Sequence, residues 1–174
     1  MRRLLLLRHS KTERPEPGER DRDRKLMPRG RADAPVIGAY MARHRLVPDL
    51  VLVSPAQRTV ETWALVGAAF SEAPPVVKQD RIYNASTETL ADLIRETDDA
   101  TALLVVGHNP GLHDLATELI GSGDLEARES LNGKLPTSGL VVIDFAFDDW
   151  SKLHDCSGRL DRFVTPHSIG PASD

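Results

Sequence analysis

The sequence predicts an α/β domain in which helices cover both faces of a mostly parallel central sheet. Short apolar runs alternate with stretches whose apolar residues recur at helical spacing. The first run, Leu4 to Leu7, is four consecutive leucines, which indicates a strand buried on both faces. A chain of 174 residues suits one domain with a full hydrophobic core. We expect this domain to span residues 1–167, with a flexible tail at 168–174.

The first half of the chain is expected to form two strand–helix units. The charged stretch from Ser10 to Arg31 is expected to be a loop, either solvated or lying over the end of the first strand as a flap. Helical spacing of apolar residues predicts a helix over 31–45, and Leu50 to Val53 is expected to be a second buried strand. Ser54 then suits the N-cap of the next helix, and Pro55 suits its first position.

The second half of the chain continues this alternation. The expected strands lie at 76–78, 102–106, 140–145 and, at an edge of the sheet, 160–164. Ser86 or Thr87 is expected to cap a helix, and Asn109 and Pro110 are expected to open another. Residues 121–134 are polar, so we expect a loop there.

Composition excludes several classes of protein. The net charge of -4 gives no electrostatic case for binding nucleic acid or an anionic membrane. No apolar run is long enough to cross a bilayer, and four leucines after Arg2 and Arg3 are too few for a signal peptide. The only cysteine, Cys156, cannot form an intramolecular disulfide. A reducing, cytoplasmic location is therefore expected.

Basic side chains follow three of the predicted strands. Arg8 and His9 come directly after the first strand, Arg58 lies in the first turn of the helix after the second, and His108 follows the strand at 102–106. The carboxyl ends of parallel strands share one edge of the sheet, where ligands bind. Guanidinium groups match phosphate oxygens, and helix N-termini add N–H donors. This pattern favours a phosphoryl site over the alternative that these are ordinary solvated residues.

Other uses of paired histidines find less support. No carboxylate or cysteine accompanies His9 and His108 in their motifs, and two guanidiniums would repel a divalent cation. The chain contains no G-x-S-x-G elbow, no G-x-x-x-x-G-K-[ST] loop and no G-x-G-x-x-G fingerprint. We therefore expect neither a metal nor a cofactor.

Four segments, taken in order, resemble the histidine phosphatase superfamily, also called the phosphoglycerate mutase-like fold. The similarity is greatest to its small SixA-like branch, the phosphohistidine phosphatases. The segments are Arg8-His9-Ser10-Lys11, the run from Asp23 to Pro35, the run from Pro48 to Thr59, and Val106-Gly107-His108-Asn109-Pro110-Gly111. Each segment is short, but their order over the first 120 or so residues is specific.

The resemblance implies a metal-independent phosphatase that works through a phosphohistidine intermediate. His9 would be the nucleophile, and Arg8, Arg58 and His108 would bind the phosphoryl oxygens. The arginines would supply the positive charge that Mg²⁺ supplies in kinases. His9 must attack as the neutral imidazole, and its other ring nitrogen needs an acceptor that the sequence does not identify.

The chain departs from the family pattern at two places. Ser10 stands where the family often has glycine. The stretch Asp80-Arg81-Ile82-Tyr83 occupies the place of an E-R-x-Y-like segment whose glutamate is the general acid. Asp80 is therefore the candidate acid, with Glu88 as the second choice. A protonated leaving atom matters most for an alcohol leaving group, so the missing glutamate favours phosphohistidine as the substrate.

Three functions are compatible with this pattern. Only about fifty residues separate Arg58 from His108, which leaves no room for the large helical insertions of the mutases. The resulting shallow pocket would accept a phosphohistidine-containing protein, such as a phosphotransfer domain. The alternative is a phosphatase of small phosphate monoesters or nucleotides, for which a working Asp80 would be expected. A non-catalytic phosphate-binding module is disfavoured, because all four pocket residues are present.

Overall fold

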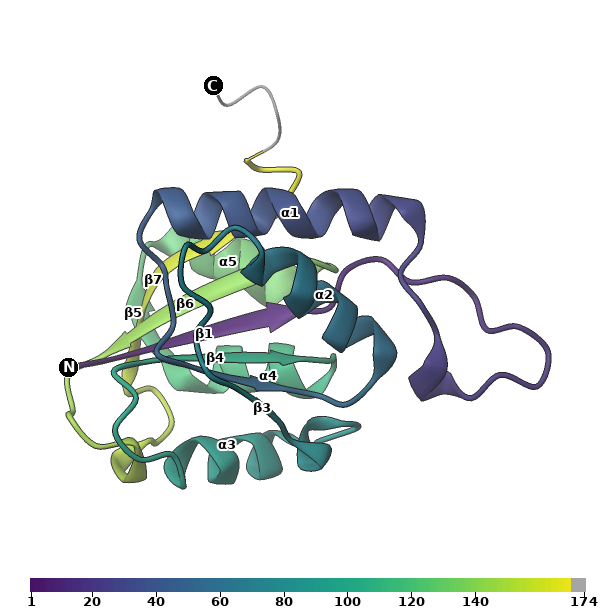
Figure 1. The fold of residues 1–174 in the computed structure, drawn as a ribbon. Coiled ribbons are helices and arrows are strands. Elements are labelled where there is room, and N and C mark those ends of the chain that lie inside the picture. The colour runs from purple at the N-terminus through teal and green to yellow at the C-terminus, as the bar shows by residue number, and fades with distance from the viewer. Residues whose placement is uncertain (170–174) are drawn as a thin grey trace.

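A seven-stranded mixed sheet forms the centre of the computed structural model, which describes residues 1–169. Helices pack on both faces of the sheet (Figure 1). The strands are β1 (Arg2–Arg8), β2 (Leu50–Val53), β3 (Val76–Lys78), β4 (Ala102–Gly107), β5 (Ile120–Gly123), β6 (Leu140–Phe145) and β7 (Gly158–Val164). The α-helices are α1 (Pro28–Arg43), α2 (Gln57–Gly67), α3 (Thr87–Arg95), α4 (Gly111–Leu119) and α5 (Leu125–Gly133). Short 3-10 helices are η1 (Asp21–Asp23), η2 (Asp80–Ile82) and η3 (Trp150–Lys152).

The strand order places the predicted site at one edge of the sheet. The order is β3-β2-β4-β1-β6-β7-β5, and the pairs β3-β2, β2-β4, β4-β1 and β7-β5 are parallel. Strand β6 runs antiparallel to both of its neighbours, and Leu7 lies opposite Val106 on one side and Leu140 on the other. The carboxyl ends of β1, β2 and β4 therefore meet the amino end of β6. The prediction of a mostly parallel sheet is confirmed.

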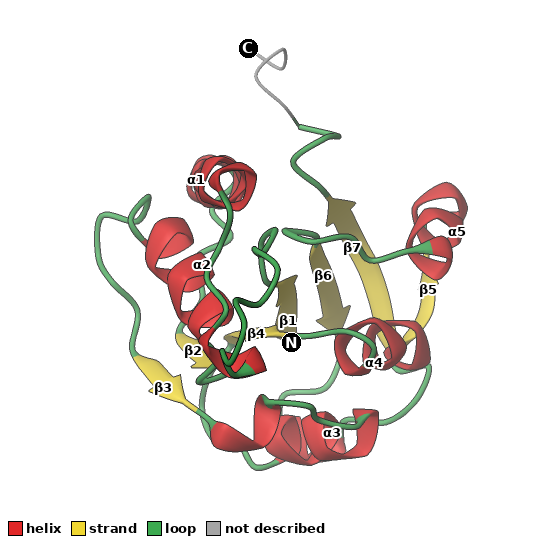
Figure 2. Cartoon of the chain, turned by 90° about the vertical axis from the view of Figure 1, so that its right-hand side faces the viewer, coloured by secondary structure: helices red, strands yellow, loops and turns green. Residues whose placement is uncertain are grey.

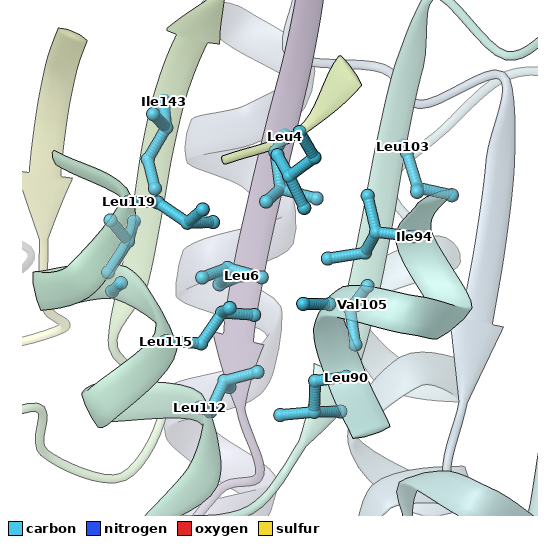
Figure 3. Packing of buried hydrophobic residues seen from close by; sticks show 14 of the residues in the cluster. Leu4, Leu6, Leu90, Ile94, Leu103, Val105, Leu112, Leu115, Leu119 and Ile143 are labelled. Atoms are coloured by element: carbon cyan, nitrogen blue, oxygen red, sulfur yellow. The ribbon is translucent and has the colours of Figure 1, made fainter. Parts of the chain in front are cut away.

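The four leucines of β1 divide the core into two layers. Leu4 and Leu6 pack with residues of α3 and α4, as Figure 3 shows. Leu5 and Leu7 pack with residues of α1 and α2 on the opposite face. Figure 2 shows the two pairs of helices on the two sides of the sheet. All four leucines are fully buried, as a strand covered on both faces requires.

The structure corrects the prediction of a loop over 121–134. Strand β5 and helix α5 occupy this segment, and Asp124 caps the helix by accepting a hydrogen bond from the N–H of Ala127 at 2.9 Å. Of the α5 residues, Leu131 is the buried one. A helix with so small an apolar face is hard to distinguish from a polar loop by periodicity.

The predicted position of strand β7 was also wrong. It begins at Gly158 rather than near 160, and it lies between β6 and β5 rather than at an edge of the sheet. Helix α1 begins at Pro28, three residues before the predicted start, because proline fits the first turn of a helix.

The first two residues of the expected tail make contacts with the rest of the domain. Ser168 and Thr165 hydrogen-bond to each other through side chain and backbone, and Ile169 packs against the core layer of α1 and α2. The rest of the predicted tail, 170–174, lies outside the described residues. None of the helices within 1–169 combines the length and the apolar character that a membrane span requires.

Candidate active site

The four predicted site residues meet at the edge formed by the carboxyl ends of β1 and β4. Arg8 ends β1 and His9 follows it, while His108 follows β4. Arg58 lies in the first turn of α2 and is 5% exposed. His9 and His108 are also buried, and their ring centroids are 5.4 Å apart. The short loops after parallel strands thus bring together residues that are fifty to one hundred positions apart in the chain.

The ring of His9 has a defined tautomer. Its Nδ1 lies 2.8 Å from the backbone carbonyl oxygen of Ser10. A carbonyl oxygen only accepts, so Nδ1 carries the proton and Nε2 presents its lone pair. The pKa of His9 is lowered to about 4, mainly by burial; the hydrogen bond to Ser10 opposes this shift, and the charges of Arg58 and Arg8 add to it. The imidazole is therefore neutral near pH 7, as a nucleophile must be.

His108 is neutral for similar reasons. Its Nε2 lies 2.7 Å from the hydroxyl oxygen of Ser54, the last residue before the turn into α2. Its Nδ1 is buried and has no hydrogen-bond partner within residues 1–169. Burial lowers the pKa of His108 to about 3, with a further contribution from the charge of Arg58. Ser54 was expected to cap α2, but the helix begins at Gln57 and Ser54 contacts the histidine instead.

Arg8 is anchored by the segment that precedes β6. Its Nη1 donates a 3.0 Å hydrogen bond to the carbonyl oxygen of Leu135. The side-chain amide of Asn109 donates to the same oxygen at 2.9 Å, rather than capping α4 as predicted. The Nε atoms of Arg8 and Arg58 are both buried and without a partner in the described chain. Burial also lowers the pKa of Arg8, which reflects a cation that is poorly solvated.

Ser10 connects the site to two other elements. Its backbone N–H donates to the hydroxyl of Thr62 at 2.9 Å, and that hydroxyl donates to the carbonyl of Arg58 at 2.7 Å. Its own hydroxyl lies 2.5 Å from that of Ser138, which has a left-handed φ of 62°. Both serines are fully buried. The backbone of residue 10 thus connects the turn after His9 to α2, and the serine hydroxyl at the place of the family glycine adds a contact to the loop before β6.

The most prominent feature that sequence reasoning missed is Asp21. Its carboxylate accepts hydrogen bonds from Arg58 Nη2 at 3.1 Å and from the hydroxyl of Tyr83 at 2.6 Å. Its backbone carbonyl accepts a third, from Arg58 Nη1 at 2.9 Å. The hydrogen bond from Tyr83, and then the charge of Arg58, hold the pKa of Asp21 below its usual range. In the sequence, Asp21 is one of several acids in a charged loop, and no local signal distinguishes it.

Neither candidate acid contacts the four basic residues through a hydrogen bond or an ion pair in the described chain. Asp80 is exposed in η2, and its carboxylate forms no hydrogen bond or ion pair within residues 1–169. Glu88 lies exposed in the first turn of α3. Arg58 instead pairs with Asp21, which comes from the segment expected to be a loop or flap. That segment does reach the site.

This arrangement suits an anion with several oxygens. Two guanidinium groups and two neutral imidazoles converge at helix N-termini, and three of their buried nitrogens lack partners in the described chain. No group of three or more His, Cys, Asp or Glu side chains within 1–169 is placed to hold a metal ion. A transferring phosphoryl group is the ligand whose charge and geometry this donor set matches.

Comparisons with known sequences give the same family. A model of the histidine phosphatase superfamily (branch 1) matches residues 4–86. An uncharacterized protein of Mycobacterium tuberculosis is 34% identical over 163 residues, which cover 92% of this chain and 99% of the relative. An uncharacterized chloroplastic protein of Arabidopsis thaliana is 29% identical over 181 residues, covering 96% of this chain and 79% of the relative.

Solved structures agree with the sequence comparison. A crystal structure described as a candidate phosphohistidine phosphatase SixA from Agrobacterium tumefaciens is 35% identical, with a TM-score of 0.82 over 95% of this chain and 98% of that one. The protein histidine phosphatase SixA complexed with tungstate has a TM-score of 0.77 over 97% of this chain and 99% of that one, and at 17% identity it shows the shared fold.

The fold and these relatives together define an enzyme of the phosphatase class. The chain belongs to the histidine phosphatase superfamily and has its phosphoglycerate mutase-like fold. The family, the fold class and the hydrolase class expected from the sequence are thereby confirmed.

Proposed function

We propose that this phosphatase removes the phosphoryl group from phosphohistidine in a protein, through a phosphohistidine intermediate on its own His9. The observation that carries the proposal is the hydrogen bond from His9 Nδ1 to the Ser10 carbonyl. It fixes Nε2 as the attacking atom, and the low pKa keeps that atom unprotonated near neutral pH.

In the first step, His9 Nε2 attacks phosphorus and the P–N bond of the substrate breaks. The bonding electron pair leaves with the substrate imidazole, which departs neutral when its distal nitrogen already carries a proton. Arg8, Arg58 and His108 stabilise the charge on the equatorial oxygens. In the second step, water attacks phosphorus, the electron pair returns to Nε2, and the water protons leave with inorganic phosphate and solvent.

The acids near the site support a phosphoramidate rather than an ester substrate. An alkoxide leaving group needs a proton from a general acid. Asp21 is held as a carboxylate by Tyr83 and Arg58, so it has no proton to donate near pH 7. Asp80 is exposed in η2 and unpaired within the described chain. The imidazole of phosphohistidine is the better leaving group and needs no such acid.

The test is a substrate panel with purified enzyme in EDTA. One arm is a protein carrying phosphohistidine, and the others are phosphate monoesters and nucleotides. We expect the phosphohistidine protein to have the highest kcat/KM, and we expect His9→Ala to abolish turnover of every substrate. The phosphoenzyme is then trapped with labelled substrate. A label on His9 that is lost in acid and retained in alkali identifies it as phosphohistidine.

The exposed Asp80 provides the discriminating variant. Asp80→Asn is expected to leave phosphohistidine turnover unchanged. Preference for one small ester, with turnover that falls in Asp80→Asn, would establish the alternative function and make Asp80 the acid. Binding of the phosphoprotein without turnover would show that the chain is a non-catalytic phosphate-binding module. Normal activity in His9→Ala would exclude the mechanism.

A further inference from the structure

A second feature at the same edge of the sheet is a groove of about 420 Å³ that is lined by Arg8 but not by His9 or His108. We call it the Arg8 groove. Its charged and titratable lining residues are Arg8, Lys11, Arg29, Asp33, Lys134 and His167. Of these residues, only Arg8 also takes part in the proposed reaction.

The topology explains why these residues meet. Lys11 follows β1, Lys134 precedes β6, and His167 follows β7. Leu140 at the amino end of β6 pairs with both Leu7 of β1 and Val164 of β7, so all three segments emerge at one edge. The N-terminal turns of α1 close the fourth side. The groove is thus a direct continuation of the edge that holds the phosphoryl site.

The walls of the groove are held by backbone contacts. The N–H of Met27, just before α1, donates to the carbonyl of Lys11 at 3.0 Å. A Cβ on Gly30 would lie 2.2 Å from the same carbonyl oxygen, so α1 and the turn after β1 are in close contact. The carbonyl of Leu135, next to Lys134, accepts the hydrogen bond from Arg8. A surface built on such contacts keeps its shape when a partner binds.

The charge of the groove is opposite to that of the molecule. Four cationic side chains line it, against the single carboxylate of Asp33, whereas the chain as a whole carries a net charge of -4. The Asp33 carboxylate lies 3.7 Å from Nε of Arg29, a loose pairing in which Arg29 is exposed and Asp33 is partly buried. Lys11, Arg29 and Lys134 are all exposed and form its rim. No acidic residue occupies the first turn of α1, where one would favour the helix dipole.

We propose that the Arg8 groove binds an acidic segment of the phosphoprotein substrate, next to the phosphohistidine that enters the active site. This inference rests on the proposed function and adds the chemistry of the partner to it. Carboxylates placed beside the phosphohistidine lie against Lys11, Arg29 and Lys134, while Arg8 is shared between the groove and the phosphoryl group. Exposed cations of this kind mainly raise the association rate and select among partners.

The form of the groove favours a protein over a small molecule. Sites for small ligands are concave, mostly apolar, and contain a few fixed polar groups. Here, the rim cations are exposed lysine and arginine side chains from three separate segments. Such a rim presents its charges to the surface of a partner and does not enclose a ligand.

The test compares two synthetic peptides, each phosphorylated on one histidine by phosphoramidate. One has glutamates on both sides of the phosphohistidine, and the other has glutamines at the same positions. For the wild-type enzyme we expect kcat/KM to be about tenfold higher for the glutamate peptide, with a preference that declines as salt increases. We expect Arg29→Glu with Lys134→Glu to remove the preference and to leave the turnover of phosphoramidate itself within about twofold.

A matched control carries two charge reversals at the opposite end of the sheet. Lys152→Glu with Arg159→Glu changes the net charge equally, at exposed positions in η3 and at the start of β7. It is expected to keep the preference for the glutamate peptide. Loss of the preference in this control would overturn the groove as the cause, because the effect would then follow net charge.

The outcomes separate the two proposals. Equal turnover of both peptides by the wild type overturns the groove inference and leaves the proposed function standing. Failure to dephosphorylate either peptide, with good turnover of esters, overturns the proposed function itself. A wild-type preference for small bisphosphates over monophosphates that is lost in the Arg29 and Lys134 double variant would assign the groove to a small substrate and overturn the protein partner.

Discussion

The hydroxyl of Tyr83 donates a hydrogen bond of 2.6 Å to the carboxylate of Asp21, across 62 positions of sequence. The same carboxylate lies 3.1 Å from Nη2 of Arg58. Arg58 also lies over the ring of Tyr83, with Cζ 5.9 Å from the ring centroid. The guanidinium that is expected to bind a phosphoryl oxygen is therefore already paired with a carboxylate, and the hydrogen bond to that carboxylate raises the pKa of Tyr83.

Asp21→Asn is expected to lower KM for phosphorylated substrates by about three- to tenfold. The substitution removes a negative charge that competes with phosphate for Arg58 and repels it. Steady-state kinetics and inhibition by inorganic phosphate measure the effect. Tyr83→Phe, which removes the hydrogen bond but not the charge, should change KM in the same direction by less. A higher KM in Asp21→Asn would mean that the carboxylate orients Arg58 rather than competing for it.

Arg58→Ala is expected to reduce kcat by about 10²- to 10³-fold, as is usual when a donor to a developing charge is lost. The fold should persist, because the removed side chain is a buried cation with an unpartnered Nε in the described chain. Thermal unfolding provides the check. Inorganic phosphate should raise the Tm of the wild type by binding the folded state, and it should raise that of Arg58→Ala much less. A collapse of Tm without phosphate would show a structural role instead.

Stability should fall as the pH drops from about 6.5 towards 4. The pKa values of His9 and His108 are lowered to about 4 and about 3 in the folded protein, mainly by burial, from 6.5. The unfolded chain therefore binds more protons in this window, so the free energy of unfolding rises with pH across it. Each histidine should account for about 1–2 kcal/mol between pH 6.5 and 5.

Urea unfolding near neutrality and near pH 5 measures this difference, and His9→Gln should reduce it by roughly half. The same lowered pKa predicts that His9 stays unprotonated in the free enzyme down to about pH 4. Equal pH dependence in the wild type and His9→Gln would contradict the assignment of the effect to this residue.

Gly30→Ala is expected to destabilise the protein by about 1–3 kcal/mol, because the added Cβ overlaps a backbone atom that cannot rotate away. That atom is the Lys11 carbonyl oxygen, 2.2 Å from the Cβ position. Activity should fall too, since the shift displaces the turn after His9. Gly133→Ala is the control: its Cβ meets open space near the end of α5, and it should raise stability by up to about 1 kcal/mol. Denaturant unfolding of both variants decides the point.

The buried strands and the basic residues at their ends were predictable from the sequence for a physical reason. A strand covered on both faces must be apolar throughout, so Leu4 to Leu7 and Leu50 to Val53 are marked by composition alone. Polar residues directly after such strands must emerge at a sheet edge. His9 and His108 do lie at that edge, directly after β1 and β4. The N-cap of α3 was expected at Ser86 or Thr87, and it is Ser86, whose hydrogen bond to Thr89 is local.

The remaining features depend on contacts that have no local signature. Asp21 pairs with Arg58 across 37 positions, and Ser138 lies beside Ser10 across 128. Helix α5 was not predicted, because Leu131 is its one buried residue and a single apolar position shows no helical periodicity. Ser54 was expected to cap a helix, but the ring of His108 lies within reach of its hydroxyl. In each case the deciding contact is made in the folded chain by residues that are distant in sequence or by a single apolar side chain, and neither leaves a local pattern.

The reversed direction of β6 has a consequence for how substrate preference can change. Because its amino end meets the carboxyl end of β1, the loop before β6 reaches the site from outside the segment that the family model matches, residues 4–86. Leu135 in that loop binds Arg8 through its backbone carbonyl, which any residue type provides. The exposed side chains there, such as Lys134, are thus free to vary while the anchor is kept, whereas Leu135 and Ser138 are fully buried. Lengthening or recharging this loop offers a route to enzymes that recognise different partners with unaltered chemistry.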